Sequence, residues 1–131
     1  MSASLLTGQQ LLGLFELDPA GKILYCRMDS AGMWPEMMGH NFYDEVAPFE
    51  NVEEFRRCVT DFTRGEKAAD SFDFACHYDG CDHPIRVLLA RICESVNRSN
   101  TKSVLVHIRR GLTLTTSRNN RGYGLERNVD Q

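Results

Sequence analysis

Thiol and imidazole side chains are the groups of this sequence best suited to chemistry, and their spacing limits what they can do. The cysteines are Cys26, Cys58, Cys76, Cys81 and Cys93, and neither a CxxC pair nor the CxxCH attachment motif of c-type haem occurs. An odd number of cysteines without a secretory signal indicates reduced thiols. We therefore expect buried thiols that pack as small apolar side chains.

The segment around Cys81 brings thiols and imidazoles together. Cys76, His77, Cys81 and His83 offer four zinc-ligand types around one turn. In a strand, however, Cys76 and His77 point to opposite faces, so we do not predict a shared metal. Cys81 lies in or after the turn, and we expect it to be exposed and the best candidate for a reactive thiol.

Motifs of known catalytic classes are absent from the sequence. It contains no GxSxG nucleophile motif, no P-loop and no GxGxxG. The acidic pairs Asp44-Glu45 and Glu53-Glu54 stand at expected helix starts, where the helix dipole favours anions. We therefore predict that the chain is not an enzyme.

Length and composition favour one globular domain. The chain has 131 residues, a net charge of −3, 42% hydrophobic residues and 25% charged residues. The mild acidity predicts no nucleic-acid partner. No apolar run approaches the roughly 18 residues that a membrane span needs. The first residues lack the basic and apolar regions of a secretory signal, so we expect a cytoplasmic protein.

The first half of the chain predicts a hairpin, short helical turns and one longer helix. Residues 12–17 and 22–26 flank the turn Asp18-Pro19-Ala20-Gly21, which predicts two paired strands. Glycines and prolines between 29 and 48 leave room only for single helical turns, one of them over 41–46. From 51 to 65 we expect a helix with Asn51 as its cap, Gly65 at its end, and Phe55, Val59 and Phe62 on its apolar face.

The second half predicts three strands. Alternation over 72–78 places Phe72, Phe74 and Cys76 on one face, and Asp79-Gly80 is a strong hairpin turn. The next strands span 85–93, with Val87, Leu89 and Cys93 on one face, and 103–109, with Val104, Val106 and Ile108 on one face.

This order of elements predicts an α+β fold with a five-stranded antiparallel sheet and helices on one face. We place the domain at residues 12–110. Residues 1–11, which include Leu5, Leu6 and Leu11, are expected to form a helical extension, and residues 111–131 a flexible tail. Between sheet and helices we predict a pocket with the candidates Phe42, Phe55, Cys58, Phe62, Phe72, Phe74 and Cys76.

The stretch 39–48, Gly-His-Asn-Phe-Tyr-Asp-Glu-Val-Ala-Pro, resembles the GKNFFxDVAP segment of the photoactive yellow protein family of PAS domains. The following Glu54-Phe55 is similar to that family's EF, and 17–24 to its LDxxGxIL. The resemblance covers about residues 12–110. It implies a PAS fold that senses a small molecule or cofactor and passes its state to a partner.

Two departures argue against light sensing. The family carries its p-coumaric acid chromophore on a Cys directly after VAP, and here that position is Phe49, which cannot form a thioester. The segment that supplies hydrogen bonds to the chromophore is also shorter. A flavin is disfavoured because the NCRFLQ motif of flavin-type light sensors is absent.

Several occupants of the pocket remain open from the sequence. The aromatic side chains fit a colourless organic ligand, or a core that is filled and holds no ligand. Haem b needs an axial ligand in an apolar site, for which His40 and Cys58 are the candidates. An iron–sulfur cluster needs about four converging thiolates, which the sequence does not indicate.

The resemblance implies signalling through protein contacts. We expect a homodimer and a downstream signalling protein as partners, with no membrane contact. The expected dimer surfaces are the extension with Leu5, Leu6 and Leu11 and the outer face of the sheet, where Leu88 and Leu105 leave apolar surface. A ligand-free dimerisation module is the alternative to a sensor.

Overall fold

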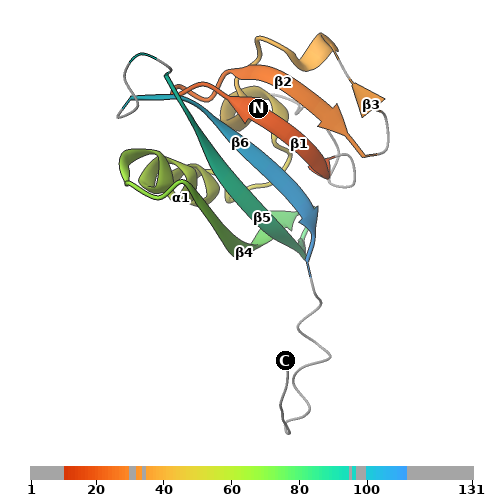
Figure 1. Cartoon of the computed structure of the whole chain (residues 1–131). Coiled ribbons are helices and arrows are strands. Elements are labelled where there is room, and N and C mark those ends of the chain that lie inside the picture. Colours follow the sequence, from red (N-terminus) through yellow and green to blue (C-terminus); the bar gives the residue numbers. More distant parts are fainter. Residues whose placement is uncertain (1–10, 30–31, 34, 95, 97–99, 112–131) are drawn as a thin grey trace, which may run out of the picture.

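The structure, a computed structural model, describes residues 11–29, 32–33, 35–94, 96 and 100–111. An antiparallel six-stranded sheet with the order β3-β2-β1-β6-β5-β4 forms one layer, and the helices lie behind it in Figure 1. The strands are β1 (Gly13–Leu17), β2 (Ile23–Met28), β3 (Gly32–Met33), β4 (Ala69–Tyr78), β5 (Cys81–Cys93) and β6 (Thr101–Arg110). The helical layer contains the 3₁₀ turn η2 (Pro35–Met37), the π-helix η3 (Phe42–Val46) and α1 (Val52–Arg64).

The five predicted strands are confirmed, and the sheet gains β3 at one edge. This strand has two residues, which pair with Arg27 and Met28 of β2. Two residues are too few to leave a periodic pattern in the sequence. Apart from Leu11, which is buried, and Gly111, the predicted extension and tail lie outside the described residues.

The turn between β1 and β2 forms as predicted and makes room for η3. Asp18 Oδ1 accepts hydrogen bonds from the backbone N–H of Ala20 at 2.9 Å and of Lys22 at 2.8 Å. Gly21 has a φ of +96°, and a Cβ there would lie 2.7 Å from the ring of Tyr43. Glycine is therefore needed at this position for its conformation and for the close approach of η3.

A cap made by Asn41 positions η3. Its side-chain oxygen accepts from the N–H of Tyr43 at 3.0 Å and of Asp44 at 3.1 Å. Glu45 reaches back and accepts from the N–H of Asn41 at 3.2 Å. This short element thereby directs Phe42 and Tyr43 into the core.

The apolar face of α1 is confirmed, because Phe55, Val59 and Phe62 are buried and Gly65 ends the helix. Asn51 occupies the predicted N-cap position, but its side chain makes no capping hydrogen bond. It lies instead on the open edge of β4.

Asn51 pairs with β4 as a short strand segment would. Its Nδ2 donates to the Ala75 carbonyl at 2.8 Å, and its Oδ1 accepts from the His77 N–H at 3.0 Å. The backbone N–H of Glu50 also donates to the His77 carbonyl, at 2.7 Å. Edge groups without a partner favour unwanted pairing with other chains, and this contact covers them.

The other end of α1 is held to β5 by Arg91. Its guanidinium donates to the carbonyls of Phe62 at 2.6 Å, Thr63 at 2.7 Å, Gly65 at 2.8 Å and Lys67 at 3.0 Å. The last four carbonyls of a helix have no partner further along it, and this one side chain donates to two of them and to two carbonyls just beyond the helix.

The faces of β5 follow the predicted alternation except at its end. Val87 and Leu89 are buried on the helix side, opposite Ile108 and Val106 of β6. Cys93, predicted on the same face, is exposed. The register shifts between Ile92 and Cys93, and such a bulge interrupts the alternation of the strand.

Candidate functional site

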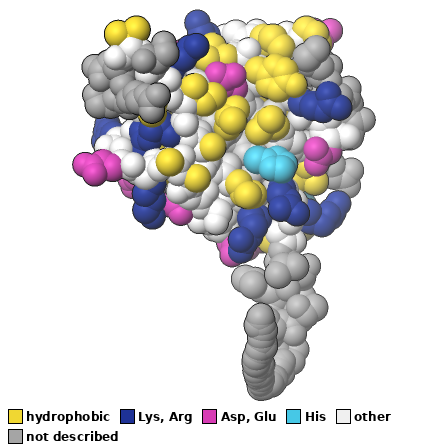
Figure 2. Space-filling view, in the orientation of Figure 1, with side chains coloured by type: hydrophobic (Ala, Val, Ile, Leu, Met, Phe, Trp, Pro, Cys, Tyr) yellow, Lys and Arg dark blue, Asp and Glu magenta, His cyan; other side chains and the backbone are white. Residues whose placement is uncertain are grey.

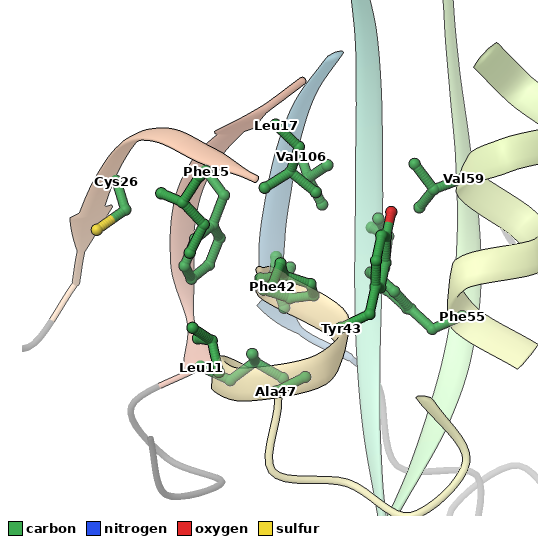
Figure 3. Close-up of a cluster of buried hydrophobic side chains, with 14 of the residues drawn as sticks. Leu11, Phe15, Leu17, Cys26, Phe42, Tyr43, Ala47, Phe55, Val59 and Val106 are labelled. Atoms are coloured by element: carbon green, nitrogen blue, oxygen red, sulfur yellow. The ribbon is translucent and has the colours of Figure 1, made fainter. Parts of the chain in front are cut away.

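Four predicted pocket residues meet between the sheet and the helices. The ring centroid of Phe55 lies 5.8 Å from that of Phe42, 6.1 Å from Phe72 and 5.4 Å from Phe74. Figure 3 shows Phe42 and Phe55 pointing toward each other from η3 and α1. These separations are those of rings in direct contact, so the rings pack on one another.

Phe49 joins this aromatic cluster, which we define as Phe42, Phe49, Phe55, Phe72 and Phe74. It is 4% exposed, and its ring centroid lies 5.6 Å from Phe55 and 5.9 Å from Phe74. A side chain of the protein therefore occupies the space beside the rings that were predicted to line a ligand pocket.

Two of the other predicted pocket residues, Cys58 and Phe62, lie around an open groove, which we call the Cys58 groove, whereas Cys76 is buried in the core and does not line it. The groove has a volume of about 440 Å³, and Phe62, Phe72 and Leu89 form its apolar wall beside Cys58. Asp61, Glu66, Lys67 and Asp70 also line it. Cys58 is thus exposed in the groove and outside the aromatic cluster.

The cysteines do not share one environment. Cys26 and Cys76 are buried, whereas Cys58, Cys81 and Cys93 are exposed, as was expected for Cys81. Burial raises the pKa of the Cys76 thiol to about 12, so this thiol stays protonated at neutral pH. Burial and the nearby Asp61 carboxylate also raise the pKa of Cys58, which makes its thiolate scarce.

The two candidate haem ligands, His40 and Cys58, both lie at the surface. The side chain of His40 is 41% exposed, and its Nδ1 lies 2.6 Å from the Glu45 carboxylate. That hydrogen bond lowers the pKa of Glu45. Within the described ranges, no three His, Cys, Asp or Glu side chains are placed to hold a metal ion.

Comparison with solved structures decides the fold. The chain is similar to the PAS domain of BvgS from Bordetella pertussis, with 14% identity, a TM-score of 0.54 and coverage of 80% of each chain. It is also similar to the photoactive yellow protein domain of the sensor histidine kinase Ppr from Rhodospirillum centenum. That match has 18% identity and a TM-score of 0.56, and it covers 75% of this chain and 90% of the other.

The chain has the PAS fold. No model of a known protein family matches the sequence, and no curated protein matches it. The PAS fold predicted from the motif of residues 39–48 is therefore confirmed by structure.

The PAS sheet has an outer face that no described helix covers. Leu14 of β1, Leu105 of β6 and Leu88 and Ala90 of β5 are half-buried on this face, with Ala90 directly opposite Leu105. Figure 2 shows hydrophobic side chains gathered over the sheet, with basic side chains below them. The prediction that Leu88 and Leu105 lie on the outer face is confirmed.

No helix in the described part of the chain is both long enough and apolar enough to cross a membrane.

One further feature is a groove beside Tyr43, between α1 and the β1–β2 turn. Its residues come from four separate elements, so no local pattern indicates it.

Proposed function

We propose that this chain is a non-catalytic PAS signalling domain that acts through protein–protein contacts, with a second copy of itself as its first partner. The observation that carries the proposal is the half-buried apolar surface on the outer face of the sheet. A downstream signalling protein would read the association state.

The outer-face residues lie on neighbouring strands in the order β1-β6-β5. Leu105 pairs with Ala90, and Leu88 lies two residues before Ala90 on β5, so these three side chains adjoin. His107 of β6 stands opposite both Leu14 and Leu88 and separates them. Apolar side chains that adjoin on an uncovered sheet face favour an interaction site. A two-fold dimer would use the same patch on both copies.

The filled aromatic cluster supports association over cofactor binding at that place. Phe49 occupies the space beside Phe55 and Phe74, so a ligand there would have to displace a buried ring. This favours the ligand-free interaction module among the alternatives that the sequence left open.

The test is the mass in solution by sedimentation across a range of protein concentrations. We expect a dimer that Leu105→Glu converts to a monomer, because a charge would be buried in the interface. The matched control is Val96→Glu, since Val96 is 96% exposed and lies outside the strands, between β5 and β6. A monomeric wild-type chain, or an equal mass for wild type and Leu105→Glu, would contradict the proposal.

A deletion variant separates the two expected dimer surfaces. Leu11 is buried in the core of the domain and is therefore not available for a dimer contact as was expected. Removing residues 1–10 tests the extension and leaves Leu11 in place, and we expect a lower mass if Leu5 and Leu6 contribute to the contact. An unchanged mass would leave the sheet face as the whole interface.

Small-molecule sensing is the second candidate function, and the Cys58 groove favours it. The groove's volume of about 440 Å³ falls in the range typical of ligand sites, and its wall is mostly apolar. Mass spectrometry of molecules extracted from the purified protein tests this candidate. An absorption spectrum of protein purified without oxygen tests haem and iron–sulfur binding in the same sample.

A further inference from the structure

Tyr43 is buried, and its hydroxyl has no hydrogen-bond partner among the described residues. The residue is 7% exposed, and its ring packs edge-on against Phe42 with centroids 5.5 Å apart. Figure 3 shows the hydroxyl at the end of the ring that lies farther from η3, facing the space beside Val59. Buried polar groups almost always have partners, so this hydroxyl calls for an explanation.

The ring that carries the hydroxyl is fixed from both sides. Gly21 lies against the ring so closely that a Cβ would be 2.7 Å away. The guanidinium carbon of Arg56 lies 5.1 Å from the ring centroid, and Arg56 itself pairs with Asp44 at 3.6 Å and Glu53 at 3.7 Å. The hydroxyl therefore has a defined position before any ligand binds.

The hydroxyl opens into a hollow of about 240 Å³ between α1, β1, β6 and the β1–β2 turn. We call it the Tyr43 groove and define it by Leu17, Tyr43, Val59, Thr60, Arg64 and Val104. Leu17, Val59 and Val104 give it an apolar floor. A second hollow of about 410 Å³ adjoins it and shares Pro19, Tyr43, Thr60 and Arg64. The charged side chains of Glu53, Arg56, Arg57 and Asp61 also line this second hollow.

The charged and polar groups around the groove favour an acceptor. Within the described residues, Arg64 has no carboxylate within 4.0 Å. The carboxylate that lines the groove belongs to Asp18, and its Oδ1 is already occupied by two backbone N–H groups. Burial raises the pKa of Tyr43, partly opposed by the Arg56 charge, so its hydroxyl remains a protonated donor at neutral pH.

We propose that the Tyr43 groove binds a small apolar carboxylic acid. The carboxylate accepts a hydrogen bond from the Tyr43 hydroxyl and pairs with the Arg64 guanidinium, and the hydrocarbon part packs on the apolar floor. This site is distinct from the outer sheet face, because it lies on the helix side of the sheet.

The proposal is tested by titrating the full chain with benzoate. Calorimetry measures the affinity, and NMR of the methyl groups locates the site. Benzamide is the control ligand, since it has the same shape and no charge. We expect benzoate to shift the methyl signals of Val59 and Val104 and to bind more tightly than benzamide. Tyr43→Phe and Arg64→Gln should each weaken benzoate binding about tenfold or more.

Two controls keep the test sharp. Arg86→Gln removes an arginine that pairs with Asp73 across β4 and β5, away from the groove, and should leave benzoate binding unchanged. Tyr43→Phe should melt at the same or a higher temperature without ligand, because the hydroxyl has no partner to lose. The proposal is overturned if benzoate does not bind, if Tyr43→Phe binds it as tightly as wild type, or if Tyr43→Phe melts lower.

Discussion

Arg91 shows how much of this fold can depend on a single side chain. Its guanidinium serves four carbonyls at and beyond the end of α1, and its carbon lies 5.0 Å from the Phe62 ring centroid. The side chain therefore connects β5 with both the backbone and the apolar face of α1. The residues of the Cys58 groove lie around the same helix end.

Replacing Arg91 with Met should lower the free energy of unfolding by about 1–3 kcal/mol, since the part-buried carbonyls of Phe62 and Thr63 would lose a donor. Urea unfolding followed by circular dichroism measures this. Arg86→Met is the matched control, because the Arg86–Asp73 pair is exposed and such pairs contribute only about 0–1 kcal/mol. Equal losses in the two variants would show that Arg91 does not hold the helix end.

At the scale of elements, the β1–β2 turn and η3 must fit together. Gly21 has a left-handed backbone conformation, and because it has no side chain it leaves room for the Tyr43 ring beside it. Asn41 completes the contact by donating from its side chain to the Ala20 carbonyl at 3.0 Å. The turn is thus a packing surface for η3 as well as a connection between strands.

Gly21→Ala should destabilise the protein more than Gly80→Ala. Both glycines have a positive φ, so both variants carry strain of about 1 kcal/mol. A Cβ at Gly80 meets nothing within 4 Å, whereas at Gly21 it overlaps the Tyr43 ring. Melting temperatures of the two variants measure the difference. A Gly21→Ala variant no less stable than Gly80→Ala would mean that η3 can move away without cost.

At the scale of the whole molecule, the helical layer and the sheet meet through the aromatic cluster. Phe49 lies between η3 and α1 and Phe55 lies in α1, whereas Phe72 and Phe74 lie in β4. The resemblance of residues 39–48 to the photoactive yellow protein family leads us to expect a ligand pocket in this region. Here the region is packed, and this supports an output through surfaces.

Phe49→Ala should lower the free energy of unfolding by about 3–5 kcal/mol, because it removes a buried ring from a packed cluster. Chemical denaturation measures the loss, with Val96→Ala as the exposed control. A loss below about 1 kcal/mol would indicate that the cluster is loosely packed, and it would reopen the case for a ligand between sheet and helices.

The parts of this protein that the sequence predicts are those with a local physical cause. The apolar spacing of Phe55, Val59 and Phe62 requires only the period of a helix. The turn at Asp79-Gly80 requires only two residues with positive φ, and both have it, at +54° and +75°. The alternation in β4 and β6 likewise follows from the period of a strand.

Only the tertiary structure decided the contacts between remote segments. Asn51 satisfies the edge of β4, 24 to 26 residues away, in place of capping its own helix. Arg91 reaches carbonyls up to 29 residues away, and Tyr43 lines a groove built from four elements. Buried donors, acceptors and surfaces find partners wherever the fold brings them, so sequence spacing determines the elements and packing determines the sites.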